Sequence, residues 1–135
     1  MQVQPYLFFE GRCQEAIDFY CRALGATVVM QMAFKDSPEP TGQPPGAGDK
    51  VMHATLRIGE TEVFMSDGRC SGAATFQGFS LSLNPANDAA AASVFAALAD
   101  GGTVTMPLAK TFFASSFGMV DDRFGVGWMV MVQGQ

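Results

Sequence analysis

The chain has 135 residues, a length that suits one domain and leaves little room for two independent cores. Hydrophobic residues make up 48% and charged residues only 16%, which excludes a largely disordered chain. Thirteen acidic against eight basic side chains give a net charge of −5, which argues against nucleic acid or an anionic membrane as a partner. Because one small core cannot bury this much apolar surface, we expect a cavity lined with apolar side chains or a subunit interface.

In chain order, the first half predicts a strand, a helix and three further strands. The helix carries a stripe of apolar residues at helical spacing and stops at Gly25, a residue that readily adopts the left-handed conformation at a helix end. A segment rich in proline and glycine, residues 35–50, predicts a long loop. The expected strands are residues 4–9, 27–34, 51–58 and 62–66, and the expected helix is 13–24.

The second half predicts the same series of elements. Residues 79–83 alternate between apolar and polar, as a half-buried strand does. Asn87 or Asp88 can cap the alanine-rich helix that follows, and Gly101 can end it. Three strands are then expected around residues 104–106, 117–120 and 127–132.

The two halves also match residue by residue. Several residues between Ala16 and Met30 recur 76 positions later, and Arg57-Ile58-Gly59 is matched 66 positions later by Arg123-Phe124-Gly125. The change of offset places about ten extra residues in the first copy, in the 35–50 loop. We therefore expect an α+β fold: a single domain, residues 1–135, built of two βαβββ modules at about 1–67 and 77–135.

Three cysteines without paired spacing, Cys13, Cys21 and Cys70, favour free thiols in a reducing compartment, and no zinc-binding cysteine or histidine pattern occurs. The first residues lack the pattern of a signal peptide, and no apolar run approaches the ~18 residues of a membrane span. We expect a cytoplasmic protein that does not contact a membrane.

The opening stretch Tyr6-Leu-Phe-Phe-Glu-Gly11, followed by residues 15–20 and 23–26, resembles the vicinal oxygen chelate superfamily, which includes glyoxalase I, extradiol dioxygenases and bleomycin-resistance proteins. Residues 48–59, 101–108, 110–113 and 117–122 are similar to its PhnB-like branch, whose members are often labelled 3-demethylubiquinone methyltransferase, whereas residues 114–116 depart from the branch's usual polar or charged sequence. The resemblance implies two βαβββ modules whose curved mixed sheets surround a ligand cleft, a small-molecule ligand, and a homodimer.

The resemblance also implies where a metal would be held, at one pair of positions in each module. These positions fall at Pro5, His53, Gly78 or Phe79, and Met129. Only His53 offers a donor suited to a hard or borderline divalent metal. We therefore expect no metal site and no cofactor, with a divalent metal kept as the alternative.

Candidate ligand-binding residues follow from strand alternation. His53, Thr55 and Arg57 share one face of their strand, and His53 is the best single catalytic candidate because imidazole titrates near neutral pH. The alternatives are a hydrogen-bonded strand histidine and a salt-bridged Arg57. Asp121-Asp122 is expected to be solvated. The remaining candidates lie in the second half and are Ser80, Ser82, Phe113 and Met129.

The sequence leaves three possible functions open. The missing metal donors and the nine methionines favour a protein that binds a small molecule in an adaptable pocket. The alternatives are a metal-assisted isomerase, lyase or dioxygenase on a small metabolite, and a homodimeric scaffold without turnover. Methyltransferase activity is not expected, because the glycines at 46–48 follow no strand and the chain is short for a Rossmann-like fold. Whether the protein is an enzyme stays open.

Overall fold

The computed structural model of the protein describes residues 1–39 and 41–134. The chain divides into two compact units, Met1–Ala74 (unit 1) and Thr75–Gln135 (unit 2). In the described residues no helix has the length and hydrophobicity needed to cross a membrane.

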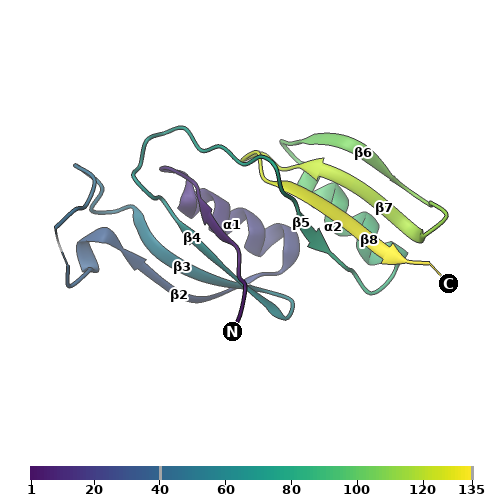
Figure 1. Ribbon diagram of the computed structural model, residues 1–135, viewed down its shortest axis with the longest axis horizontal. Helices are drawn as coiled ribbons and strands as arrows, with labels where there is room; N and C mark the ends of the chain where they lie inside the picture. Colours follow the sequence, from purple (N-terminus) through teal and green to yellow (C-terminus); the bar gives the residue numbers. More distant parts are fainter. Residues whose placement is uncertain (40, 135) are drawn as a thin grey trace. The chain divides into compact units, whose positions relative to one another are not determined.

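Unit 1 is a four-stranded sheet with one α-helix (Figure 1). The strands lie in the order β1-β4-β3-β2, with β1 parallel to β4 and the other neighbours antiparallel. A short 3-10 helix, η1, follows β2. The elements are β1 (Tyr6–Phe8), α1 (Cys13–Leu24), β2 (Thr27–Ala33), η1 (Phe34–Asp36), β3 (Val51–Ile58) and β4 (Thr61–Ser66).

The core of unit 1 lies between α1 and one face of this sheet. The apolar stripe of α1 packs onto β2 and β3, and Ile17 and Tyr20 at its centre are fully buried. Gly25 ends the helix at a positive φ of 65°, as expected from the sequence. On the sheet side the buried partners include Leu7, Ala54, Leu56, Val63 and Met65.

Unit 2 repeats this arrangement, with strand order β5-β8-β7-β6 and β5 parallel to β8. The side chain of Asn87 accepts a 2.8 Å hydrogen bond from the backbone N–H of Ala90 and caps α2. Phe95 and Leu98 of α2 lie in the core with Trp128 and Val130 of β8. The elements are β5 (Leu81–Leu83), α2 (Asp88–Ala99), β6 (Thr103–Ala109), β7 (Ala114–Asp121) and β8 (Gly127–Gln133).

The identical strand orders confirm the repeated βαβββ unit and the α+β class. The first strand of each unit is shorter than expected, because it pairs with its neighbouring strand over only a short stretch. In unit 2, Leu81 pairs with Trp128, so Phe79 and Ser80 run past Gly127, where β8 begins, and lie outside the sheet. Strand β6 is longer than expected and includes Pro107, which an edge strand tolerates because one row of its amides needs no partner.

The long loop expected at residues 35–50 separates β2 from β3, and Pro40 within it lies outside the described residues. Its described parts pack against the rest of unit 1. The Gln43 side-chain amide donates a 2.7 Å hydrogen bond to the carbonyl of Phe34, and Ala47 is buried. This segment is the main departure of unit 1 from the pattern of unit 2.

Candidate functional site

The sheet face of unit 1 opposite α1 carries a group of rings, which we call the aromatic cluster: Tyr6, Phe8, His53 and Phe64. Tyr6 pairs with Phe64 in register, and Phe64 pairs with Thr55 on β3. The ring centroids of Tyr6, His53 and Phe64 lie 5.4–5.7 Å apart, and Tyr6 stacks on Phe8 at 4.8 Å. Tyr6 and Phe8 are 42% and 48% exposed, so the cluster presents aromatic surface outside the core.

His53 is held on both sides within this cluster. The Tyr6 hydroxyl lies 2.8 Å from Nδ1, and Nε2 lies 3.2 Å from the Thr55 hydroxyl oxygen. These contacts fit a neutral imidazole whose Nδ1 accepts a hydrogen bond from the Tyr6 hydroxyl and whose Nε2–H donates a hydrogen bond to Thr55. The expected pairing of His53 and Thr55 on one face is confirmed by this contact. The imidazole of His53 is therefore fixed in place, and its geometry suits hydrogen bonding as well as it suits a general base.

Tyr6 stays a donor in this arrangement. Burial raises the pKa of its phenol above the ordinary value. The phenol therefore remains protonated at neutral pH and keeps its hydrogen for Nδ1 of His53.

Arg57 shares this sheet but is already paired. Its guanidinium donates a 2.8 Å hydrogen bond to the carboxylate of Glu62, its register partner on β4, and both side chains are partly exposed. The sequence alternative of a salt bridge is the one found. A role for Arg57 in binding a ligand stays a prediction, because the anion would have to compete with Glu62.

In unit 2 the predicted residues do not form one group. Ser82 pairs in register with Met129, so their side chains share the sheet face opposite α2. Ser80 precedes β5, with its hydroxyl beside Gly127. Phe113 lies in the connection between β6 and β7, where its ring meets Phe117 at 5.2 Å.

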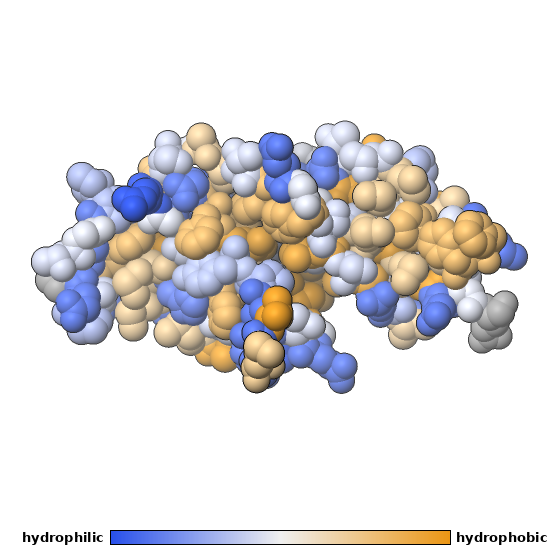
Figure 2. Space-filling model, viewed as in Figure 1, coloured by the Kyte–Doolittle hydropathy of each residue, from blue (hydrophilic) through white to orange (hydrophobic). Residues whose placement is uncertain are grey.

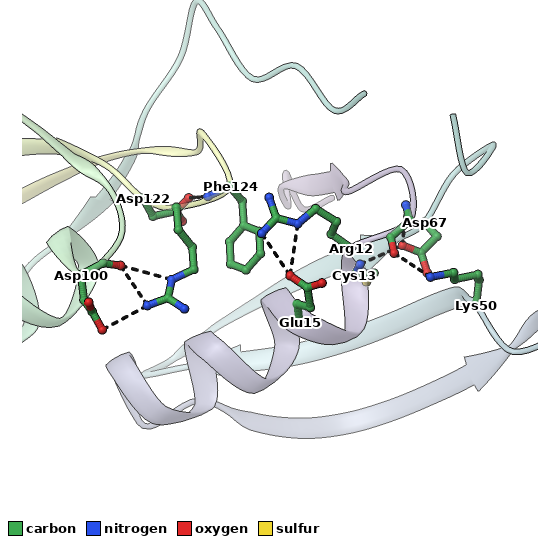
Figure 3. Close-up of polar contacts among 10 residues, drawn as sticks. Arg12, Cys13, Glu15, Lys50, Asp67, Asp100, Asp122 and Phe124 are labelled. Carbon is green, nitrogen blue, oxygen red and sulfur yellow. Dashed lines mark hydrogen bonds and ion pairs between the residues drawn. The ribbon is translucent and has the colours of Figure 1, made fainter. Parts of the chain in front are cut away.

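Two buried carboxylates hold turns near these strands. Asp67, which is 1% exposed, accepts 2.8 Å hydrogen bonds from the backbone N–H groups of Gly11, Cys13 and Val51. Figure 3 shows Asp67 beside Cys13 at the start of α1. Asp67 thereby joins the start of α1 to the start of β3, the strand that carries His53. In unit 2, the expectation that Asp122 is solvated is wrong: it is buried.

The residues at the metal positions implied by the resemblance do not fit a divalent metal. Both nitrogens of His53 already have partners, and Pro5 precedes β1 without a side-chain donor. In unit 2, Gly78 and Phe79 supply no hard donor and Met129 supplies only a thioether. Across residues 1–39 and 41–134, no group of three or more His, Cys, Asp or Glu side chains could hold a metal ion.

Sequence reasoning missed Tyr6, Phe8 and Phe64 as site residues. The alternation around Leu7 was a usable signal, since it places Tyr6 and Phe8 together on the face away from the core. Phe64 gives no such signal, because its place beside Tyr6 depends on the parallel pairing of β1 with β4.

Comparison with known proteins places this geometry in a family. The model of the family described as 3-demethylubiquinone-9 3-methyltransferase matches residues 1–131. The chain belongs to this PhnB-like family. A glyoxalase-related enzyme from Fulvimarina pelagi shares the fold, with a TM-score of 0.62 at 16% identity over 98% of this chain and 88% of its own.

More similar proteins match nearly the whole chain. Protein PA1353 from Pseudomonas aeruginosa is 43% identical with a TM-score of 0.87, over 100% of this chain and 99% of its own. Protein YjdN from Escherichia coli is 37% identical over 98% of this chain and 95% of its own. A protein from Bacillus cereus, described as a putative 3-demethylubiquinone-9 3-methyltransferase and PhnB protein, is 27% identical with a TM-score of 0.82, over 98% and 99%.

Proposed function

We propose that this PhnB-like protein binds a small, flat, amphipathic molecule on the aromatic cluster of unit 1, without the metal chemistry known in its superfamily. The observation that carries the proposal is the contact of three rings, Tyr6, His53 and Phe64, on a sheet face that the helix of unit 1 does not cover. Aromatic faces bind planar ligands by stacking, and polar groups placed among them orient the ligand.

The polar groups of the cluster suit orientation more than turnover. The hydrogen bonds of His53 to Tyr6 and Thr55 hold the imidazole at a set angle, and a ligand that displaces Thr55 would gain the Nε2–H of His53 as a donor. A general base needs a nitrogen within reach of a substrate proton, and here each ring nitrogen already has a partner. Methyl transfer is not part of the proposal, because neither unit contains a Rossmann-like parallel sheet with a glycine-rich turn after its first strand.

A thermal-shift screen of planar metabolites tests this proposal. A ligand present at about 100 times its dissociation constant stabilises the folded protein by about 2.7 kcal/mol, a readily measured rise in melting temperature. We expect His53→Gln and Phe64→Leu to lose at least about half of that stabilisation, because each removes a ring from the cluster. Glu60→Gln, an exposed change in the turn between β3 and β4, is the matched control and should keep it.

Two results would contradict this proposal. Equal stabilisation of wild type and His53→Gln by every active compound would place the ligand elsewhere. Mass spectrometry of each active compound after incubation gives the second: a product that forms with wild type and not with His53→Gln would make the protein an enzyme.

We also propose that the protein is a homodimer, with the second copy covering the outer edges of the two sheets. Strands β2 and β6 are edge strands, each paired on one side only within the described residues. Both present large apolar side chains to solvent, and a bulge occurs at the same place in each. Such edges attract another strand unless they are covered. The exposed residues are Val28, Val29 and Met30 on β2, and Val104 and Met106 on β6.

Light scattering with size-exclusion chromatography tests the dimer. We expect twice the 14.3 kDa chain mass for the wild type, and a single chain mass for Val28→Lys combined with Val104→Lys, because a charge on each edge opposes burial. Thr61→Lys, on the exposed start of β4, is the control and should remain dimeric. A monomeric wild type at about 100 µM, well above the dissociation constant of a stable interface, would contradict the proposal.

A cytoplasmic location completes the proposal. All three cysteines, Cys13, Cys21 and Cys70, are free thiols, as proteins of a reducing compartment keep them. Burial raises the pKa of the Cys13 thiol, with a further contribution from Asp67, so Cys13 stays protonated and resists oxidation.

A further inference from the structure

Unit 2 contains a pocket of about 560 Å³ that lies outside the site described above. It opens between the start of α2, the connection from β6 to β7, and the end of β8. This volume is within the range of pockets that hold small molecules. All residues around it belong to unit 2, whereas the aromatic cluster belongs to unit 1. Binding at one site can therefore be tested independently of binding at the other.

One wall of the pocket is aromatic. The Phe112 ring is 100% exposed and lies 5.1 Å from the Phe113 ring, at 80° to it. The turn that carries them is fixed: the Thr111 hydroxyl oxygen accepts hydrogen bonds from the N–H groups of Phe113 and Ala114, and the Thr111 N–H donates to the carbonyl of Ala114. Figure 2 shows apolar surface at this end of unit 2, over the β6–β7 connection. A fixed turn that exposes two adjacent rings supplies a stacking surface.

The charges around the pocket are separated. Lys110 lines it, and within the described part of the chain its ammonium group has no hydrogen bond or ion pair. On the α2 side, Asp88 Oδ1 accepts 2.7 Å hydrogen bonds from the hydroxyls of Ser115 and Ser116. These bonds hold the pKa of Asp88 below its ordinary value, so this side is negative at neutral pH. An anionic ligand group is therefore favoured at Lys110 and disfavoured at the start of α2.

We propose that this pocket binds aromatic carboxylates, with the ring against Phe112 and Phe113 and the carboxylate at Lys110. The aromatic wall supplies apolar contact area, and the free ammonium group supplies the charge that discriminates an acid from its neutral analogue. Because an exposed ion pair contributes at most about 1 kcal/mol, the preference for acid over amide is about fivefold.

A titration of the full-length protein labelled with ¹⁵N tests this site, using 3-phenylpropionate and its neutral analogue 3-phenylpropionamide. We expect the acid to shift the backbone amide signals of residues 111–115 and 87–88, to leave residues 53–55 unchanged, and to bind about fivefold more tightly than the amide. Lys110→Gln should remove this preference without weakening the amide. Phe112→Ala should weaken both ligands, and it should fold normally because the ring is fully exposed.

Lys35→Gln, a change of an exposed lysine in unit 1, is the matched control and should leave both affinities unchanged. The proposal is overturned if the acid and the amide bind wild type equally, if Lys110→Gln keeps the preference, or if no shift appears at residues 111–115 below about 10 mM ligand. A loss of dimer mass in Phe112→Ala would also overturn it, since the rings would then be covered by a second copy.

Discussion

Replacing Asp67 with alanine is expected to lower the free energy of unfolding by about 3 to 5 kcal/mol, because buried N–H groups lose their acceptor. Those of Gly11, Cys13 and Val51 each lie 2.8 Å from this carboxylate, and Asp67 itself is almost completely buried. Urea unfolding followed by far-UV circular dichroism measures the loss.

Asp67→Asn gives the graded comparison. Its side-chain oxygen can still accept from Gly11 and Cys13, but its NH₂ group faces the N–H of Val51, so we expect a loss between those of wild type and Asp67→Ala. Asp49→Ala, which removes an exposed carboxylate paired with Lys35, should cost far less. Equal effects of the Asp67 and Asp49 changes would show that the network carries no stability.

The consequence of Asp67 for function is positional. The carboxylate joins the turn after β1 to the first residue of β3, and these strands carry Tyr6 and His53. Without this carboxylate the two strands would be held less firmly, and the side chains of Tyr6 and His53 would separate and lose their 2.8 Å hydrogen bond. The core of unit 1 and its candidate site therefore share one support.

The repeated fold could be predicted from the sequence because its signals are local. Apolar spacing marked α1, Gly25 marked its end, and the second copy matched the first. The ends of β1 and β5 were less predictable. Each pairs with a strand far along the chain, and the point where that partner begins, such as Gly127, decides how far the pairing runs.

The candidate site was predictable only where strand alternation suffices. It placed His53 with Thr55, and the structure adds Phe64 through a strand pairing that no local pattern reveals. The burial of Asp122 was also not predicted, because it too depends on tertiary contacts. An acidic pair near a turn is usually solvated, and here the indole of Trp128 and the backbone of the turn fold over the second carboxylate of the pair.

Asp122 is the second position where a large effect is expected. Its Oδ1 accepts hydrogen bonds from the N–H groups of Phe124 and Val126, and its Oδ2 accepts a 2.9 Å bond from the indole N–H of Trp128. Figure 3 shows Asp122 beside Phe124 in the turn between β7 and β8. We expect Asp122→Ala to lower the free energy of unfolding by about 2 to 4 kcal/mol, because buried donors are left without an acceptor.

Its neighbour supplies the control. Asp121, the last residue of β7, is exposed, and Asp121→Ala removes the same charge from the neighbouring position, so its effect should stay within about 0.5 kcal/mol. Trp128→Phe separates the indole bond from the backbone bonds, and combining it with Asp122→Ala should cost less than the sum of the two changes, because both remove that bond. Trp128 is the only tryptophan, so its emission in Asp122→Ala reports the lost bond directly. Equal unfolding free energies for Asp121→Ala and Asp122→Ala would mean that net charge, rather than the turn, determines the stability of unit 2.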